Sequence, residues 1–427
     1  MAKGTIYVCS NCGYTTYQWY GKCPSCQQWG TLVEKSAQGK SDTKRTKGSY
    51  KKPVKISSIK GEHPRLKTNS AFDGFFGGGL VKGGVYLISG TPGVGKSTLL
   101  LQLADMLSKT GSRVVYISAE ESLEQISMRA GRLNIESVDV VSETESEAIA
   151  SLIEFESADC FIVDSIHTIH SNALDSVVGG VQQVRYCAEM LIEKAKLSMK
   201  TLIIVAHVTK EGSIAGPKML EHMVDCVAFL DNREDLRVLK LSKNRFGSTD
   251  EALIMEMDSS GLKLVSDPTM RFVSKAGATE GVAQGVIVEG KYPILVEIQA
   301  LCVETPLAIP RRVSVGFDLN RLHMILAVIE KRLNLPMFKY DVYLNIAGGI
   351  KLTSTLADMA VVASILSSLK KRQLPERAVF AGEMDLAGRF RVPRRFIKHI
   401  ARLKEFGFHL LSAEDGPSTI NELISSL

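Results

Sequence analysis

VYLISGTPGVGKSTLLLQL, residues 85–103, decides the fold of this chain. VYLIS is a short apolar run, typical of a strand that is buried on both faces of a parallel sheet, and TLLLQL begins a helical pattern. Between them, Gly90 to Ser97 fill every position of the P-loop pattern GxxxxGK[ST]. Because this pattern stands between a strand and a helix, it predicts a nucleotide-phosphate site in an α/β domain.

The loop residues have separate predicted roles. Gly93 and Gly95 let the backbone wrap around the phosphates at the N-terminus of the following helix. Lys96 is expected to bridge the β- and γ-phosphates of ATP, and Ser97 to bind Mg²⁺. The residues expected to bind the nucleotide are Gly90, Thr91, Pro92, Gly93, Val94, Gly95, Lys96, Ser97 and Thr98, together with Asp164 and His207.

Three later apolar runs have the same character as the strand before the P-loop: RVVYISA (113–119), CFIVD (160–164) and TLIIVAH (201–207). Helical patterns lie between them, among them residues 98–109 and 181–197. This alternation predicts an α/β domain with a largely parallel sheet over residues 61–270.

Polar residues end these predicted strands. Asp164 is expected to be the Walker-B carboxylate that holds Mg²⁺ through water; the alternative is a helix cap. Glu120 and Glu121 follow the run VVYISA, and one of them is expected to polarise the attacking water, with solvated loop acids as the alternative. His207 either senses the γ-phosphate or is structural.

Four cysteines are clustered near the N-terminus. Cys9 and Cys12 form one CxxC knuckle, and Cys23 and Cys26 form a second. Two such knuckles complete a closed four-sulfur zinc site, so residues 1–34 are predicted to be a zinc finger. A redox role is disfavoured, because there are two CxxC pairs and no surrounding βαβ pattern.

The partner of this zinc finger is left open by the sequence. The short connection between the knuckles carries Trp19, Tyr20 and Lys22, which would allow binding of either DNA or protein. The other four cysteines lie in apolar stretches and are expected to be small buried hydrophobic residues; they are Cys160, Cys187, Cys226 and Cys302.

Charge is unevenly distributed along the 427 residues, whose formal net charge is +6. Residues 1–60 carry 11 Lys or Arg and 2 Asp or Glu, whereas the remainder carries 41 and 44. Nucleic-acid affinity is therefore expected from the N-terminal region or from local clusters, not from a generally basic surface. Residues 35–60 are basic and polar and are predicted to be a flexible linker, either a solubilising tether or one that also contacts phosphates.

No stretch approaches the roughly 18 apolar residues that span a bilayer. The N-terminus also lacks the apolar core of a secretory signal. We therefore expect a cytoplasmic protein without a membrane partner.

Residues 271–427 are predicted to form a second domain. The strand-like runs VAQGVIVEG and YPILVEIQAL precede amphipathic helices at 318–332 and 355–371 and a short helix near 394–405. Upstream of this domain, the box KNRFG (243–247) lies between the apolar runs 236–241 and 252–257. It is predicted to be the turn of a β-hairpin, although Lys243 and Arg245 could instead reach a phosphate of a neighbouring molecule.

Several segments together resemble the bacterial RadA (Sms) family of DNA repair and recombination ATPases over the whole chain. They are YVCSNCGY with GKCPSC, GTPGVGKSTLLLQ, HVTKEGSIAGPKMLEHMVD (207–225), KNRFG and KYDVYLNIAGG. The resemblance implies a four-Cys zinc finger, a RecA-like P-loop ATPase core and a C-terminal α+β domain similar to the Lon protease fold. It assigns the catalytic acid to Glu120, and it associates Lys243 and Arg245 with ATPase coupling and DNA engagement.

The resemblance also implies a function. A ring-shaped homo-hexamer would engage single-stranded and branched DNA and promote branch migration of recombination intermediates, with recombinase and replication-fork proteins as further partners. One alternative is an ATP-switched loader or stabiliser of recombinase on single-stranded DNA that does not translocate. Another is a KaiC-like regulatory ATPase without a nucleic-acid partner.

A Lon-like fold raises the question of protease activity. A Lon-type peptidase needs a serine activated by a lysine. Leu356 and Ile397 stand at the corresponding positions, and aliphatic side chains transfer no protons. Ser354 and Lys398 lie one or two residues away and so on other helical faces. The domain is therefore expected to be catalytically inactive and to serve assembly.

Overall fold

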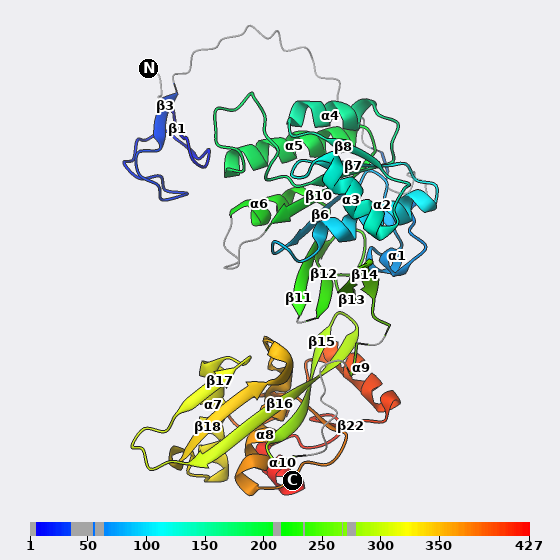
Figure 1. The fold of residues 1–427 in the computed structure, drawn as a ribbon. Coiled ribbons are helices and arrows are strands. Elements are labelled where there is room, and N and C mark those ends of the chain that lie inside the picture. The colour runs from blue at the N-terminus through cyan, green and yellow to red at the C-terminus, as the bar shows by residue number, and fades with distance from the viewer. Residues whose placement is uncertain are drawn as a thin grey trace. The chain divides into compact units, whose positions relative to one another are not determined.

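The computed structural model describes residues 6–35, 54–55, 64–207, 215–233, 235–266, 268–270 and 279–427 (Figure 1). Most of the predicted linker 35–60 lies outside the described residues, as does part of the stretch HVTKEGSIAGPKMLEHMVD, residues 208–214.

The N-terminal module is a small antiparallel sheet of strand order β2-β1-β3. Its strands are β1 (Ile6–Cys9), β2 (Thr15–Thr16) and β3 (Leu32–Lys35). Tyr7 pairs with Thr16 on one side and with Glu34 on the other. The core of the module consists of Cys9, Cys23 and Leu32, so its cysteines also serve as its hydrophobic centre.

A nine-stranded sheet follows, with the order β14-β13-β12-β11-β6-β10-β9-β7-β8. Its strands are β6 (Val85–Gly90), β7 (Val114–Ser118), β8 (Asp139–Ser142), β9 (Cys160–Asp164), β10 (Thr201–His207), β11 (Cys226–Arg233), β12 (Leu236–Asn244), β13 (Ala252–Asp258) and β14 (Gly261–Leu264). The pairs β8–β7, β7–β9, β9–β10, β10–β6 and β6–β11 are parallel, and β12 is antiparallel to β13. The predicted parallel α/β sheet and the hairpin around KNRFG are confirmed.

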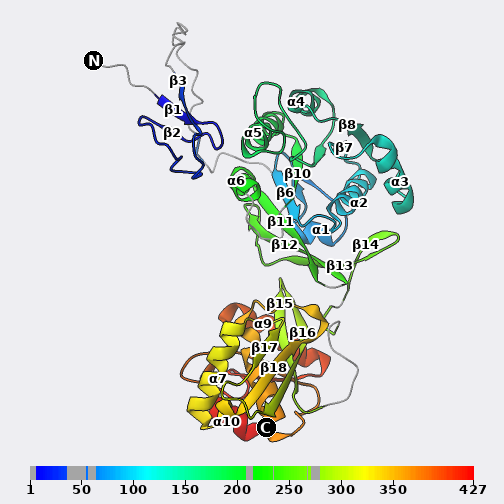
Figure 2. The same ribbon diagram turned by 60° about the vertical axis from the view of Figure 1, so that its left-hand side comes forward.

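Helices cover both faces of the parallel strands. They are α1 (Ala71–Phe75), α2 (Lys96–Lys109), α3 (Leu123–Leu133), α4 (Ser146–Phe155), α5 (Val181–Leu197) and α6 (Ala215–Met223). In Figure 2, α2 and α3 lie on one side of β6, β7 and β10, and α4 and α5 lie on the other. Alternate strand residues such as Val85 and Leu87 share a core cluster with α4 and α5. All residues of β6, β7 and β9 are buried, which explains their uninterrupted apolar sequence. A two-stranded ribbon, β4 (Arg65–Leu66) and β5 (Leu80–Val81), precedes β6.

The C-terminal region contains a six-stranded sheet of order β17-β18-β16-β15-β19-β22. Its strands are β15 (Val282–Glu289), β16 (Tyr292–Glu304), β17 (Arg312–Val315), β18 (Tyr340–Ile346), β19 (Ala378–Ala381) and β22 (His409–Ser412). The strands β20 (Glu383–Met384) and β21 (Phe390–Arg391) form a separate ribbon. The helices are α7 (Leu319–Leu333), α8 (Asp358–Lys370), α9 (Arg394–Ala401) and α10 (Ile420–Ser426), with short 3₁₀ turns at Met337–Lys339, Ala347–Gly349, Thr355–Ala357 and Arg402–Phe406.

The amphipathic character predicted for one helix is wrong. The helix predicted at 355–371 is not amphipathic: Asp358 to Ser367 of α8 are all buried. Its neighbours explain this, because α8 packs against β15, β16 and β19 and also contacts α7 and α10. Leu356, which was expected to stand in place of a Lon serine, is 1% exposed, and Ile397 packs against the hydrophobic cluster that contains Leu356.

The chain divides into two compact units. The first comprises Met1–Leu230, Ser242–Ser248 and Ser259–Gly261, and the second comprises Asp231–Leu241, Thr249–Asp258 and Leu262–Leu427. The predicted domain limits, 1–34, 35–60, 61–270 and 271–427, and the Lon-like character of the last domain stay predictions. Within the described ranges, no helix is long and apolar enough to cross a bilayer.

Candidate functional site

The P-loop adopts a conformation that its glycines permit. Gly93 and Gly95 have φ angles of 75° and 108°, in the left-handed region that favours glycine. A β-carbon at Gly90 would lie 2.4 Å from the carbonyl oxygen of Leu230 on the adjacent strand β11. Gly95 is also the N-cap of α2, and no side chain caps this helix. The first N–H groups of α2 are therefore free of a side-chain acceptor and suited to bind phosphate.

The parallel register brings the predicted strand-end residues to one edge of the sheet. Gly90 of β6 is paired with His207 of β10, and Ser118 of β7 is paired with Asp164 of β9. Because the strands run in the same direction, their carboxyl ends share this edge with the P-loop. Four segments that are distant in sequence therefore meet around Lys96.

Lys96 is buried at this edge and fully hydrogen-bonded. Its Nζ donates to the carbonyl oxygens of Gly90 at 3.0 Å and Thr91 at 3.1 Å, and it lies 3.0 Å from Nδ1 of His207. Burial lowers the pKa of Lys96, while the nearby carboxylates of Asp164 and Glu120 act in the opposite direction. The ammonium thus lies in a low-dielectric site with a balancing negative charge.

His207 connects Lys96 to Glu120. Its Nε2 lies 3.1 Å from Oε1 of Glu120. An ammonium can only donate hydrogen bonds, so Nδ1 of His207 accepts the hydrogen bond from Lys96. A neutral His207 then carries its proton on Nε2, and this N–H donates a hydrogen bond to Glu120. The Ser165 hydroxyl donates to the same carboxylate oxygen. These bonds, led by that of His207, lower the pKa of Glu120 to about 2, so its carboxylate is ionised at neutral pH.

The structure separates the two candidate acids. The carboxylate of Glu121 turns away from the P-loop and accepts from Arg129 of α3 at 2.5 Å. The Glu121 backbone N–H and C=O both bond to the Ser118 hydroxyl, which fixes the turn after β7. Only Glu120 is joined to the Lys96 and His207 network.

Asp164 has a partner that sequence reasoning missed. The buried hydroxyl of Tyr116 donates to Oδ2 of Asp164 at 2.5 Å, across the register of β7 and β9. Burial, followed by the charge of Asp164, raises the pKa of Tyr116, which keeps the hydroxyl protonated as a donor. Ser165 was missed as well, because a serine after a Walker-B aspartate carries no distinctive signal.

The KNRFG box lies at the opposite end of strand β6. The Nζ of Lys243 donates to the carbonyl oxygens of Glu221 at 2.6 Å and Val224 at 2.8 Å, at the C-terminus of α6. Arg245 pairs with Asp225 at 3.1 Å. Asp225 also accepts from the N–H of Val85, the first residue of β6, at 3.1 Å. Lys243 and Arg245 are therefore not brought to the P-loop of their own chain.

The aromatic residue of the box is also turned inward. The ring of Phe246 lies 5.9 Å from that of Tyr86, and the Tyr86 hydroxyl accepts from the N–H of Val81. A β-carbon at Gly84 would lie 3.1 Å from both aromatic rings. The hairpin turn is thereby held against the start of β6, while the side chain of Arg245 stays 55% exposed.

The four predicted zinc ligands converge. Their sulfurs all lie within 4.8 Å of one another, and the Sγ atoms of Cys9 and Cys26, and of Cys12 and Cys23, are each 3.6 Å apart. Four thiolates about 2.3 Å from a tetrahedral zinc ion are roughly 3.8 Å apart, so the arrangement fits zinc. The turns Gly13 N–H to Cys9 and Gln27 N–H to Cys23 close the two knuckles.

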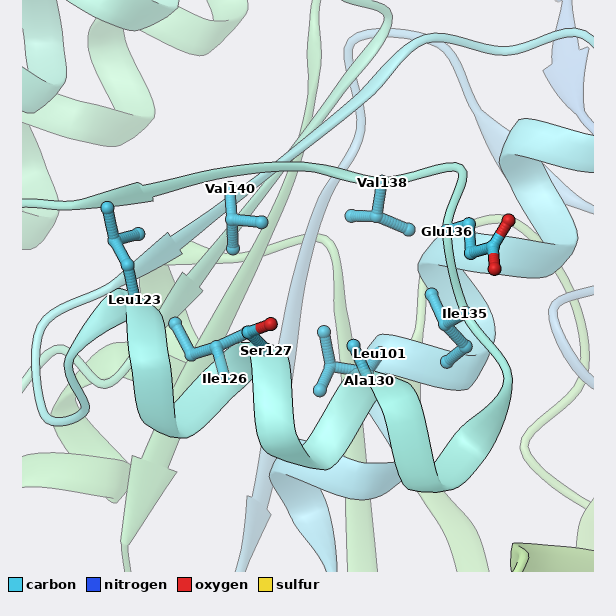
Figure 3. A pocket seen from close by; sticks show the side chains of 9 residues that line it. All are labelled: Leu101, Leu123, Ile126, Ser127, Ala130, Ile135, Glu136, Val138 and Val140. Atoms are coloured by element: carbon cyan, nitrogen blue, oxygen red, sulfur yellow. The ribbon is translucent and has the colours of Figure 1, made fainter.

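A separate hollow lies between α2, α3 and β8 (Figure 3). It has a volume of about 320 Å³ and is lined mainly by apolar side chains, including Leu101, Ile126 and Val140, with Ser127 and Glu136 as its polar groups. None of the predicted site residues lines it, so it is not the phosphate site.

The zinc site can be tested with two cysteine variants. We expect the wild-type chain to be purified with zinc in a one-to-one ratio and Cys23→Ser to lose most of it, because three thiolates no longer close the tetrahedron. Cys302→Ser, in β16, is the control and should keep its zinc. Metal analysis of the purified proteins measures this; equal zinc in both variants would contradict the assignment.

The contacts of Lys243 predict a stabilising role. Lys243→Met keeps the aliphatic stem but leaves two carbonyl oxygens of the α6 terminus without their donor, and we expect it to lower the free energy of unfolding by about 1–2 kcal/mol. Arg185→Met, which removes the exposed ion pair with Glu189 on α5, should cost less than about 0.5 kcal/mol. Chemical denaturation followed by circular dichroism measures both, and equal effects would argue against the capping role.

Two family models match parts of this chain. Residues 7–34 match the family described as rubredoxin metal binding domain, a zinc ribbon, and residues 68–145 match the KaiC ATPase family. A solved KaiC-like protein of Pyrococcus horikoshii is similar at 19% identity and a TM-score of 0.41, covering 48% of this chain and all of that one. The ATPase domain implies ATP and Mg²⁺ as cofactors, and the ribbon implies Zn²⁺.

Relatives extend over nearly the whole chain. DNA repair protein RadA of Helicobacter pylori is 40% identical over 420 residues, which cover 96% of this chain and 93% of that protein. DNA repair protein RadA of Bacillus subtilis is 42% identical, covering 94% and 90%. At this identity and coverage, the chain belongs to the bacterial RadA family of DNA repair proteins.

Proposed function

We propose that this chain is a DNA-dependent ATPase of recombinational DNA repair, which promotes branch migration of recombination intermediates by ATP-driven movement on DNA. The observation that carries the proposal is the convergence of Lys96, His207, Glu120 and Asp164 on one sheet edge beside the P-loop. The relatives named as DNA repair proteins supply the substrate class.

In this proposal the P-loop and the open N-terminus of α2 bind the phosphates of ATP, and Ser97 and Asp164 hold Mg²⁺. ATP supplies the phosphoryl group that water attacks, and Mg²⁺ offsets its charge. Tyr116 keeps one oxygen of Asp164 fixed, so the carboxylate presents a constant face to the metal.

Glu120 is the residue that we expect to orient the attacking water. With a pKa of about 2 it stays ionised and accepts a hydrogen bond from the water rather than storing a proton. Its bond to His207 ties this carboxylate to the end of β10. If Lys96 turns from His207 toward phosphate, His207 can keep Glu120 as its partner.

Lys243 and Arg245 are proposed to couple ATP hydrolysis to movement. They hold the end of α6 and Asp225, and α6 begins only eight residues after His207. Because both side chains lie away from the P-loop of their own chain, we propose that the exposed Arg245 acts on a neighbouring subunit's ATP or on DNA. A homo-hexameric ring would bring neighbouring subunits into that position.

The proposed partners are single-stranded and branched DNA, with recombinase and replication-fork proteins as protein partners in the cytoplasm. The alternative is an ATP-switched loader that stabilises recombinase on single-stranded DNA without translocating. The two differ in whether ATP turnover moves a DNA branch.

The assignment of Glu120 predicts a sharp difference between adjacent glutamates. Glu120→Gln should retain ATP binding but lose about 100-fold or more of the hydrolysis rate, because it removes the anionic acceptor for water. Glu121→Gln, which affects only the bond to Arg129, should stay within a few-fold of wild type. Steady-state phosphate release and nucleotide binding measure these effects. A slow Glu121→Gln and an active Glu120→Gln would reverse the assignment.

The motor function is tested by DNA stimulation and branch movement. We expect single-stranded DNA to raise ATP turnover of the wild type, and a branched substrate to be resolved only with ATP. Arg245→Ala should lose the stimulation; unstimulated turnover should fall as well if Arg245 acts on a neighbouring ATP and should be kept if it acts on DNA. Arg132→Ala, which replaces an exposed arginine of α3, should behave as wild type.

Each outcome of this experiment has one meaning. If DNA does not change the ATP turnover of the wild type, the motor function is refuted and the regulatory ATPase is favoured. Stimulated turnover without branch movement would favour the loader. An unchanged Arg245→Ala would leave the box with only its structural role.

A further inference from the structure

The zinc ribbon exposes the only two tryptophans of the chain, Trp19 and Trp29. Trp19 is 57% exposed and Trp29 is 75% exposed. A β-carbon at Gly21 would lie 3.5 Å from the Trp29 ring and 3.9 Å from the Trp19 ring, so the two indoles flank the same glycine. Two adjacent, solvent-exposed indoles form an apolar surface of the kind that marks a binding site.

The metal knuckle fixes the position of Trp29. Lys22 and Trp29 form an antiparallel bridge, and the N–H of Cys23 bonds to the carbonyl of Gln28 at 2.9 Å. The N–H of Gly30 bonds to the carbonyl of Gly21 at 2.9 Å, which closes the same hairpin. Trp29 is therefore held by the backbone that presents Cys23 and Cys26 to the metal, and its ring is preorganised for a ligand.

The surrounding side chains extend this surface. Tyr17 is 81% exposed and Tyr20 is 40% exposed, and the Lys22 ammonium lies 6.0 Å from the centre of the Trp29 ring. These rings take no part in the core of the module, which is formed by Cys9, Cys23 and Leu32. The aromatic rings are thus not explained by folding of the ribbon.

The amino-acid sequence of the ribbon and of the segment that follows it in the chain favours a nucleic acid over a protein. Residues 6–35 contain one acidic residue, Glu34, and residues 36–60 carry eight Lys or Arg and one Asp. Flat aromatic rings beside cations are the features that bind single-stranded nucleic acid, where bases stack on the rings and cations attract phosphates. A base-paired duplex keeps its bases stacked inside and offers no free base face to an indole.

We infer that Trp19 and Trp29 form a stacking surface for unpaired bases of single-stranded DNA, with Lys22 contacting the adjacent phosphate. This inference rests on the proposed function, because it takes DNA as the partner. It adds a second DNA contact, on the ribbon, to the ATPase unit that hydrolyses ATP. Its consequence is a preference for the unpaired strand at a DNA branch.

The two tryptophans provide a direct readout in the full chain. Oligo(dT) is added without nucleotide, and its binding is followed by the anisotropy of a labelled oligo(dT) and separately by intrinsic tryptophan fluorescence. We expect quenching that saturates together with the anisotropy. Heparin, a polyanion without bases, should compete for binding but cause no quenching.

Three results would overturn the inference in distinguishable ways. Anisotropy without quenching would mean that DNA binds elsewhere and would leave the aromatic surface to a protein partner. Equal quenching by heparin would show that charge alone causes the signal. No rise in anisotropy, either in this titration or in its repeat with ATP and Mg²⁺, would refute the DNA partner itself, and with it the proposed function.

Variants separate stacking from folding. Trp29→Ala and Trp19→Ala should each weaken oligo(dT) binding by about fivefold or more, while Trp29→Phe, which keeps a ring, should stay close to wild type. Phe155→Ala removes an equally exposed ring (80%) from α4 and is the matched control. Unchanged zinc content shows that each ribbon is folded. An equal loss of affinity for duplex DNA would contradict base stacking.

Discussion

The shared direction of β6, β7, β9 and β10 is the constraint on which the ATPase site depends. Each strand is buried along almost all of its length, and the charged groups of the site lie where the strands end. Parallel register places these ends on one edge and joins Lys96, His207 and Glu120 into one hydrogen-bonded chain. Burial alone would favour a neutral Lys96, and the adjacent carboxylates oppose this effect. The network is therefore a product of strand direction and charge balance together.

The position of the site at the ends of parallel strands explains which of its residues could be predicted from the sequence. A residue that ends an apolar run, such as Asp164 or His207, is visible in sequence because the signal is local. Tyr116 is not, since a tyrosine inside an apolar run is typical of core, and its bond to Asp164 exists only through the register of β7 and β9. The choice between Glu120 and Glu121 depended on a contact eight residues downstream, with Arg129, that no spacing rule specifies.

The KNRFG box shows a second limit of sequence reasoning. Its hairpin followed from the flanking apolar runs and was confirmed, but the direction of the Lys243 side chain did not follow. A helix ends with carbonyl oxygens that need donors, and α6 ends at Met223, beside Lys243 in space although about 20 residues away in sequence. A loss of activity in a Lys243 variant therefore has a structural explanation first. Arg245, whose side chain is half exposed and is paired with Asp225 within the described part of the chain, is the better probe of coupling.

In the C-terminal unit, packing occupies the two positions that the sequence analysis compared with a catalytic pair. Leu356 and Ile397 are 41 positions apart, yet they belong to one hydrophobic cluster with Val286 and Leu403. If these are the positions of a Lon serine and lysine, the catalytic pair has been replaced by packing. A lysine restored at 397 beside buried aliphatic side chains would bring a charge against apolar surface without a partner carboxylate among the members of that cluster. A lysine at this position would thus weaken the packing of the cluster.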